Sequence, residues 1–299
     1  MIDLHVHSTA SDGTNTPEWL AERGKDYAVM ALTDHDNVDG VRRFLDESAR
    51  IGARGIRLAG LELSIEPGEG YNKFHLLCLG IDPENEGLLD FLDRIREGRN
   101  ERNREICAKL AAMGYAFPME ELRKYANGKI VARPHIARVM MDHGWAESVH
   151  DAFTRFLGDG APAYVPRYRP SQQEAIDVVH AASGAAVMAH PRYWTNDATM
   201  LRTGLARLKE MGLDGIEAVY EANCPGETVE HLRTARELDL PVTAGSDFHG
   251  ANKPNISLGM KVDDEDAFIA PFLARLAARR AECAAKNAPS HETGREVTQ

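Results

Sequence analysis

Short apolar segments alternate with longer amphipathic segments along most of this 299-residue chain, and few folds accommodate such an alternation. Seven apolar segments are typical of buried strands, at residues 2–6, 29–33, 56–64, 74–81, 185–189, 215–220 and 241–245. Segments with helical periodicity lie at residues 16–27, 38–50, 172–182, 200–211, 227–238 and 265–285. Strands that alternate with helices favour a parallel sheet or barrel, and the chain is long enough for one such domain.

The alternation is interrupted between residues 83 and 170, where the pattern is helical throughout. Helices are predicted there at residues 87–113, 119–126, 134–143 and 148–157. The charged stretch within the first of these, IREGRNERNRE, is interpreted as a solvated helix face crossed by ion pairs. We therefore predict a barrel formed by residues 1–82 and 171–285, with residues 83–170 as a helical insertion that caps the active site. Residues 286–299 are polar and are predicted to form a flexible tail.

Net charge, cysteine spacing and the length of the apolar runs indicate which kinds of partner the chain can have. The net charge of −11 argues against an extended nucleic-acid-binding surface, although bound divalent ions could still attract a small anionic substrate. The four cysteines form no C-x-x-C pair, and no apolar run is long enough to span a membrane. The first residues resemble a strand, so we expect no signal peptide. We expect a cytoplasmic protein with no membrane partner. The oligomeric state stays open.

Residues of the types that bind metal ions lie on or just after the predicted strands. On the first strand, His5 and His7 are two residues apart and should point the same way. The full set is His5, His7, Asp12, His35, Glu62, His75, His190, Asp247 and His249. The carboxyl ends of barrel strands form the active-site face, and nine ligands exceed the four that one zinc ion takes. We expect two or three divalent ions, as in enzymes that hydrolyse phosphoesters or amides.

Other polar residues near these positions are interpreted differently. Asp36 is expected to support a ligand or cap a helix rather than bind metal. Glu217 and Glu221 are assigned structural roles. The remaining histidines of the helices and tail are expected to face solvent: His143, His150, His180, His231 and His291.

Several motifs resemble those of the PHP (polymerase and histidinol phosphatase) family. They are Asp3-Leu-His-Val-His7-Ser, Ser11-Asp-Gly13, Leu32-Thr-Asp-His-Asp36, Gly60-Leu-Glu62, His75, Ala189-His-Pro191 and Gly245-Ser-Asp-Phe-His249. The resemblance covers the whole chain except the tail. It implies an α/β fold, a distorted (β/α)7 barrel with the helical insertion, and a metal-dependent phosphoesterase with a trinuclear metal centre.

The resemblance also implies which residues bind each ion. The first ion would be held by His5, His7, Glu62 and Asp247, the second by Glu62, His75 and His190, and the third by Asp12, His35 and His249. A hydroxide that bridges the first two ions, with His249 nearby, would be the nucleophile. Manganese is the favoured ion, with zinc and iron as alternatives.

The insertion carries a further motif, Arg133-Pro-His-Ile-Ala-Arg138. This run resembles PHP phosphatases that act on nucleoside 3′,5′-bisphosphates and on the 5′ ends of short RNA, which implies that Arg133 and His135 bind a substrate phosphate. An arginine fork suits that role because it contacts two oxygens at once. Arg192, close to His190, is a further candidate. The alternative is that Pro134 only starts a helix and that Arg133 lies at the surface.

These observations lead us to expect a small phosphorylated substrate. The favoured reaction is removal of the 3′-phosphate from nucleoside 3′,5′-bisphosphates, with short 5′-phosphorylated oligonucleotides as additional substrates. Two alternatives within the same chemistry are a phosphodiesterase acting on phosphorylated ribose 1,2-cyclic phosphate and a histidinol-phosphate phosphatase. A non-catalytic PHP module, as found in some DNA polymerases, is the alternative of another class.

Overall fold

The computed structural model describes residues 1–125 and 133–287, and the described strands form one seven-stranded sheet in chain order. The strands are β1 (Ile2–Asp3), β2 (Val29–Leu32), β3 (Ile56–Ile65), β4 (Phe74–Leu79), β5 (Ala185–Met188), β6 (Gly215–Tyr220) and β7 (Val242–Gly245). The two edges of the sheet meet, since Leu4 N donates to Ala244 O at 3.0 Å and Asp247 N donates to His5 O at 2.8 Å. The sheet is thus nearly closed into a distorted barrel, which confirms the predicted fold class.

One strand runs against the expected direction. β4 is antiparallel to both β3 and β5, whereas the other neighbouring strands are parallel. The expectation of an all-parallel sheet is therefore wrong at this strand. The physical reason is the connection of only eight residues between Ile65 and Phe74, which contains no helix. A parallel neighbour would need a longer crossover connection.

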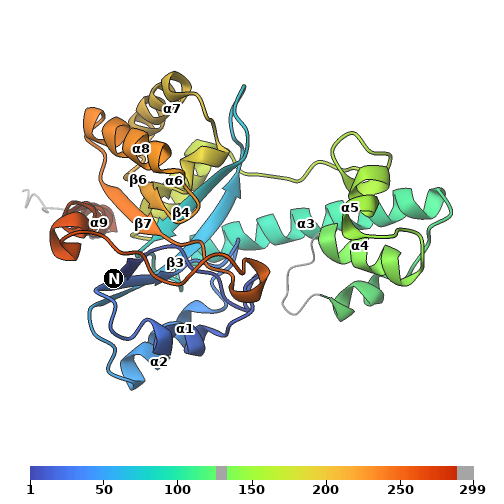
Figure 1. The fold of residues 1–299 in the computed structure, drawn as a ribbon, viewed down its shortest axis with the longest axis horizontal. Helices are drawn as coiled ribbons and strands as arrows, with labels where there is room; N and C mark the ends of the chain where they lie inside the picture. The colour runs from blue at the N-terminus through green and yellow to red at the C-terminus, as the bar shows by residue number, and fades with distance from the viewer. Residues whose placement is uncertain (126–132, 288–299) are drawn as a thin grey trace, which may run out of the picture.

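In the described part of the chain, the α-helices outside the insertion surround the barrel (Figure 1). They are α1 (Pro17–Arg23), α2 (Val41–Arg50), α6 (Gln172–Ala181), α7 (Ala198–Glu210), α8 (Pro225–Glu237) and α9 (Glu265–Asn287). Their starts follow local sequence rules. The Thr16 side chain accepts a hydrogen bond from Trp19 N before α1, and Pro17 is the first helical residue. Asp197 caps α7 in the same manner by accepting from Met200 N.

The insertion begins with the long helix α3 (Glu86–Ala112), which leads away from the barrel in Figure 1. The elements α4 (Arg133–Asp142) and α5 (Val149–Ala152) lie along its far half. They share an apolar cluster separate from the barrel core, formed by residues such as Ile106, Leu110, Ile136 and Met140. The predicted helix 148–157 is α5 followed by a π-helical turn at Phe153–Leu157, and the predicted helix 119–126 is a 3₁₀ helix at Met119–Lys124, with residue 126 outside the described part.

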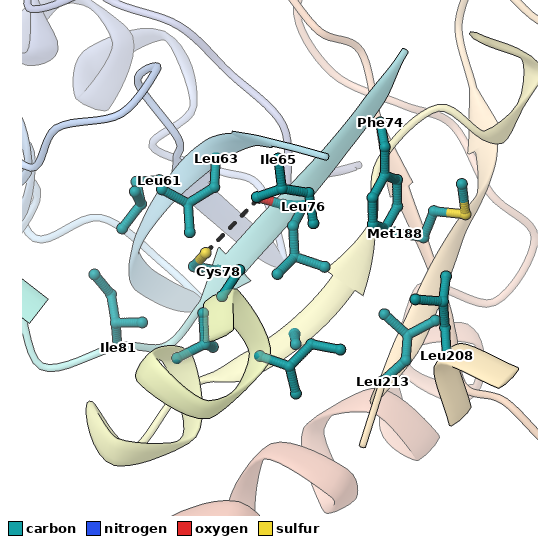
Figure 2. Close-up of a cluster of buried hydrophobic side chains, with 14 of the residues drawn as sticks. Leu61, Leu63, Ile65, Phe74, Leu76, Cys78, Ile81, Met188, Leu208 and Leu213 are labelled. Carbon is teal, nitrogen blue, oxygen red and sulfur yellow. Dashed lines mark hydrogen bonds between the residues drawn. The ribbon is translucent and has the colours of Figure 1, made fainter. Parts of the chain in front are cut away.

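The barrel core has two layers because strand residues alternate between its faces. On β3 and β4, Leu61, Leu63, Phe74, Leu76 and Cys78 point outward into a cluster beneath the surrounding helices (Figure 2). Their alternate neighbours point inward. Leu58, Leu77 and Leu79 join an inner cluster that Phe272 and Leu276 of α9 close at one end. The inward positions at the other end are therefore available for polar side chains.

Within the described residues, no helix combines the length and the apolar character required to cross a bilayer. Of the predicted flexible tail, residues 286 and 287 still belong to α9. The rest of that prediction, at residues 288–299, lies outside the described residues.

Candidate metal centre

The predicted ligands meet at one rim of the barrel, although not all by the expected route. β1 covers only Ile2–Asp3, so His5 and His7 lie in the extended segment beyond the strand and not on it. This segment is held in place by His7 N, which donates to Phe248 O at 3.0 Å. His75 is the second residue of β4, at the amino end of the strand. The antiparallel direction of β4 brings this end to the rim where the parallel strands have their carboxyl ends.

The buried carboxylate of Glu62 lies at the centre of the cluster. Its Oε1 is 2.5 Å from His75 Nδ1 and 2.9 Å from His190 Nε2. Its Oε2 is 2.8 Å from His35 Nδ1, 3.3 Å from His7 Nε2 and 3.4 Å from His5 Nε2. A carboxylate shared by five imidazoles is the arrangement expected of a ligand that bridges neighbouring ions.

The ligand atoms converge in four overlapping groups whose members lie within 4.8 Å of one another. The groups are His7, Asp12, His35 and His249; His5, His7 and Asp247; His5, Glu62 and His190; and His35, Glu62 and His75. Together they contain all nine predicted ligands. The grouping differs in part from the one that the family resemblance implies, since His75 and His190 fall in separate groups that share Glu62.

The donor atoms fit divalent ions. Several buried atoms of the cluster have no hydrogen-bond partner among the described residues: His5 Nε2, His7 Nδ1 and Nε2, His35 Nδ1, Glu62 Oε2 and His190 Nδ1. Burying such atoms without a partner costs free energy, which coordination to a cation would offset. A mixture of imidazole nitrogens and carboxylate oxygens suits manganese, zinc and iron.

Electrostatics in the cluster keep its acids ionised. Burial alone would raise the pKa of Glu62, but His75, His35 and His5 hold it well below its usual value. Asp247 behaves in the same way, since the effect of burial on its pKa is outweighed by His5 and His7. Ionised carboxylates are the form that binds metal ions.

Glu217 on β6 supports two ligands, a role that the sequence interpretation missed. Its Oε1 lies 3.0 Å from His5 Nδ1, and its Oε2 accepts a hydrogen bond of 2.7 Å from His190 N. Gly245 makes room for this arrangement, because a Cβ there would lie 2.2 Å from Glu217 Oε1 and 2.4 Å from His5 Cβ. The available signal was a single acid inside the otherwise apolar strand GIEAVY. Glu221, by contrast, is exposed.

Asp247 is also held by residues that the sequence interpretation did not single out. Its Oδ2 accepts hydrogen bonds from Tyr220 Oη at 3.0 Å and from Lys253 Nζ at 2.5 Å. Its Oδ1 faces His7 Nε2 at 3.4 Å. One oxygen of Asp247 is therefore held by neighbouring side chains, and the other faces the predicted ligand His7.

The predicted substrate-binding residues lie outside the ligand groups. Arg133 Nη1 donates to Leu157 O at 3.0 Å and lies 3.4 Å from Asp159 Oδ1, so it is anchored within the insertion. His135 is half-buried on α4, and its pKa is lowered by burial and by Arg138, with Asp12 opposing the shift. Arg192 pairs with Glu227 at 3.4 Å.

Two histidines expected in solvent are instead inside. His231 is buried on α8, and Asn223 Nδ2 lies 3.4 Å from its Nδ1. His180 is partly buried and lies 2.8 Å from Asp214 Oδ2. Both corrections have the same physical reason. The partner of each histidine lies outside the helix that carries the histidine, so helical periodicity alone could not predict the burial.

Comparison with known proteins agrees with this geometry. The model of the PHP domain family matches residues 3–157. The chain is 34% identical to the 5′-3′ exoribonuclease Rnm of Escherichia coli over 88% of this chain and 89% of that protein. It is 32% identical to the 3′,5′-nucleoside bisphosphate phosphatase of Chromobacterium violaceum over 93% of this chain and 97% of that protein.

A solved structure supports the same assignment. A protein from Bifidobacterium adolescentis, described as a metal-dependent phosphoesterase, superposes with a TM-score of 0.74 at 30% identity over 92% of this chain and 96% of that chain. The overlaps in sequence and in fold have one explanation. The chain belongs to the PHP family of metal-dependent phosphoesterases.

Proposed function

We propose that this enzyme removes the 3′-phosphate from small nucleoside 3′,5′-bisphosphates. The observation that carries the proposal is the cluster of nine predicted ligands at one rim of the barrel, among them the buried carboxylate of Glu62. A relative named for this activity matches the chain over 97% of its own length, the insertion included. Two or three divalent ions would occupy the centre, with manganese favoured over zinc and iron.

When bound, the ions supply Lewis acidity that activates water and stabilises charge on the phosphoryl oxygens. The protein holds and orients them. His5, His7, Asp247 and the shared Glu62 would hold the ions next to the scissile phosphate. Glu217 fixes the ring of His5, and Tyr220 and Lys253 fix the carboxylate of Asp247. The apolar layer below the ligands keeps water from reaching them from the barrel interior.

The substrate itself would be bound from the insertion and from the loop after β5. We assign phosphate contacts to Arg133 and His135 at the start of α4. Arg192, in the turn Pro191–Tyr193 that follows His190, would line the same pocket. In this proposal the insertion caps the site when substrate is bound.

Short 5′-phosphorylated oligonucleotides are a second candidate substrate, because a relative 34% identical over 88% of this chain is named a 5′-3′ exoribonuclease. The same ligand cluster could cleave a phosphodiester at the 3′ oxygen of a first nucleotide. The acidic chain would then contact only the end of the strand, since a net charge of −11 disfavours an extended nucleic-acid surface.

The test is phosphate release in the presence of manganese from adenosine 3′,5′-bisphosphate, ribose 1,2-cyclic phosphate 5-phosphate and histidinol phosphate, with nucleotide release from a 5′-phosphorylated trinucleotide beside them. We expect the bisphosphate to be preferred by about a hundredfold in kcat/KM, or about 2.7 kcal/mol of transition-state discrimination. Preference for the cyclic ester or for histidinol phosphate would overturn the substrate assignment. Absence of any hydrolysis by metal-loaded protein would favour a non-catalytic module.

A further inference from the structure

Tyr193 is an exposed aromatic residue at the rim that carries the predicted ligands. It belongs to the short turn after His190, and its ring centroid lies 5.1 Å from that of His190. The ring of Tyr220 lies 6.2 Å away. Tyr193 is nevertheless 41% exposed. An exposed ring that touches a predicted metal ligand is in a position to receive a planar group of a bound substrate.

Lys73 lies beside this ring. It immediately precedes β4, and its Nζ lies 5.9 Å from the centroid of the Tyr193 ring. Lys73 is exposed, and no acid of the described residues forms an ion pair with it. The other cation near the ring, Arg192, is paired with Glu227. This part of the rim therefore presents an aromatic ring together with an ammonium group that has no acidic partner.

The insertion joins the barrel on another side of the cluster. Asp36 directly follows the predicted ligand His35. It accepts hydrogen bonds from Arg99 on α3 and from Arg167 on the segment that returns from the insertion to α6. The attachment of the insertion is therefore next to His35.

This attachment buries part of α3. Arg99 is 8% exposed and Arg102 is 6% exposed, so the sequence interpretation of this stretch as a solvated face is wrong for both residues. The physical reason is the returning segment, which packs so closely on α3 that a Cβ at Gly98 would lie 3.1 Å from Cβ of Tyr168. The interpretation holds for the exposed pair of Arg104 and Glu97.

The carboxylate of Glu62 lies between these two parts of the rim. Its Oε2 is 2.8 Å from His35 Nδ1, on the side of the insertion. Its Oε1 is 2.9 Å from His190 Nε2, on the side of Tyr193. A phosphate bound over Glu62 would therefore have the insertion on one side and the ring of Tyr193 on the other.

A structural role accounts for only part of the surface of Tyr193. Contact with His190 and Tyr220 shields a predicted ligand from solvent. A ring that was itself covered would shield His190 equally well, so shielding does not explain why so much of this ring lies in water.

An oligonucleotide has groups on both sides of the phosphate that is attacked. Hydrolysis forms a bond from phosphorus to the oxygen of water and breaks the bond from phosphorus to the 3′ oxygen of the first nucleotide. That 3′ oxygen takes up a proton from the water, and the phosphate stays on the 5′ oxygen of the second nucleotide. If the first nucleotide is bound toward the insertion, as proposed above, the second lies toward the turn after His190.

We infer that Tyr193 and Lys73 form a subsite for the second nucleotide of a short oligonucleotide. The base stacks on the ring of Tyr193, and Lys73 contacts the phosphodiester that follows this nucleotide. Stacking on an aromatic ring is tolerant of base identity. A subsite for one nucleotide needs no extended basic surface, which agrees with the net charge of −11. The inference rests on the proposed function and extends it to the leaving part of the substrate.

The test removes the base from the substrate and the ring from the enzyme in turn. The manganese-loaded enzyme is given 5′-phosphorylated diadenylate and the same molecule with a stable abasic residue in second place. Wild type should prefer the intact dinucleotide by about tenfold in kcat/KM, equivalent to about 1.4 kcal/mol. Tyr193→Ala should reduce this preference to about twofold or less, whereas Tyr193→Phe, which keeps the ring, should retain it.

Tyr168→Ala is the matched control, because Tyr168 is 43% exposed and lies on the returning segment at the insertion. It should keep the wild-type preference. If Tyr193→Ala also keeps it, or if wild type hydrolyses both dinucleotides equally well, the subsite is wrong although the proposed function stands. Hydrolysis of adenosine 3′,5′-bisphosphate but of neither dinucleotide would lead to the same conclusion. If wild type hydrolyses none of the three, the proposed function itself is wrong.

A second measurement tests Lys73. It compares kcat/KM for 5′-phosphorylated triadenylate with that for the diadenylate, which lacks the phosphodiester after the second nucleotide. Lys73→Gln should lower this ratio, and it should reduce the slope of log kcat/KM for the trinucleotide against log salt concentration by about 0.7, the value for one contact to a single strand. Lys73→Arg should keep both quantities, as should the exposed control Lys261→Gln. An unchanged ratio and slope in Lys73→Gln would overturn the assignment of Lys73.

Discussion

Nδ1 of His5 and Oε1 of Glu217 lie 3.0 Å apart, and both side chains are completely buried. This contact leaves the other ring nitrogen of His5, Nε2, facing Glu62 and Asp247 at 3.4 and 3.6 Å. A carboxylate behind an imidazole fixes the orientation of the ring and makes the nitrogen on the opposite side a better metal ligand. The carboxylate of Glu217 therefore positions the ring of His5 for metal binding.

Glu217→Gln should weaken manganese binding by about 10- to 100-fold, because an amide holds the ring of His5 less strongly than a carboxylate. Isothermal titration with manganese measures this affinity directly. Glu221→Gln, at an exposed position at the end of the same strand, should bind manganese as wild type does. Unchanged affinity in Glu217→Gln would show that the contact has no positioning role.

Asp247→Asn should reduce kcat/KM by at least about a hundredfold, equivalent to about 2.7 kcal/mol, because the substitution removes an anionic ligand. The variant should remain folded, since Tyr220 and Lys253 hold the supporting side of the carboxylate. Phosphate release, metal content and circular dichroism together test this expectation. Asp263→Asn, an exposed acid outside the cluster, serves as the control.

Removal of metal ions should destabilise the protein and abolish its activity. Each tenfold rise in manganese concentration above the dissociation constant should add about 1.4 kcal/mol per site to the free energy of unfolding. Urea unfolding of chelator-treated protein at several manganese concentrations measures this dependence. Asp247→Asn should show a smaller increase in the free energy of unfolding with manganese concentration. If the free energy of unfolding of wild type does not change with manganese concentration, the assignment of the nine ligands is wrong.

Gly245→Ala should disturb the metal centre although it replaces none of the predicted ligands. The new Cβ would lie 2.2 Å from Glu217 Oε1 and 2.4 Å from His5 Cβ, so both side chains would have to move. We expect a loss of about 1–3 kcal/mol in the free energy of unfolding, typical of overpacking, together with weaker manganese binding. Gly226→Ala, which meets no atom within 4 Å, should change neither quantity.

Asp214→Asn should change how stability depends on pH. Burial would raise the pKa of Asp214, but hydrogen bonds from His180, Ala186 N and Arg279 lower it below its usual value. A lowered folded-state pKa means that the ionised acid stabilises the fold above the unfolded-state pKa, near 4, and that this stabilisation is lost as the pH falls. The variant should lose about 1–3 kcal/mol at neutral pH.

Urea unfolding of wild type and Asp214→Asn at about pH 7 and about pH 3.5 tests this pH dependence. The difference in the free energy of unfolding between the two proteins should be smaller at the lower pH. Asp90→Asn, which replaces an exposed acid on α3, should have the same free energy of unfolding as wild type at both pH values. A gap that widens on acidification would contradict the lowered pKa of Asp214.

Local patterns were sufficient to predict most elements and the residues that form the cluster at the rim of the barrel. β3 and β4 are long buried runs, and Glu62 and His75 interrupt them at inward positions. The direction of β4 was harder to predict, because it depends on whether the chain between Ile65 and Phe74 forms a helix. The short extent of β1 also escaped prediction, since the segment after it pairs with isolated residues such as Phe248.

Roles that depend on tertiary contacts could not be predicted from sequence. Glu217 and His5 are 212 residues apart, and only the closure of the barrel brings them together. Arg99 and Arg102 belong to a stretch whose composition resembles a solvated surface. Their burial results from the return of the chain past α3, which places Arg167 beside them and Asp36 within reach.

The residues predicted to bind metal and those proposed to bind the substrate phosphate come from different parts of the chain. All nine predicted ligands come from the barrel segments, whereas Arg133 and His135 come from the excursion between β4 and α6. If Arg133 and His135 bind the substrate as proposed, genetic changes confined to that excursion alter which molecule is hydrolysed while the metal ligands are inherited intact. Related enzymes with one reaction and divergent substrates are the expected product of such an architecture.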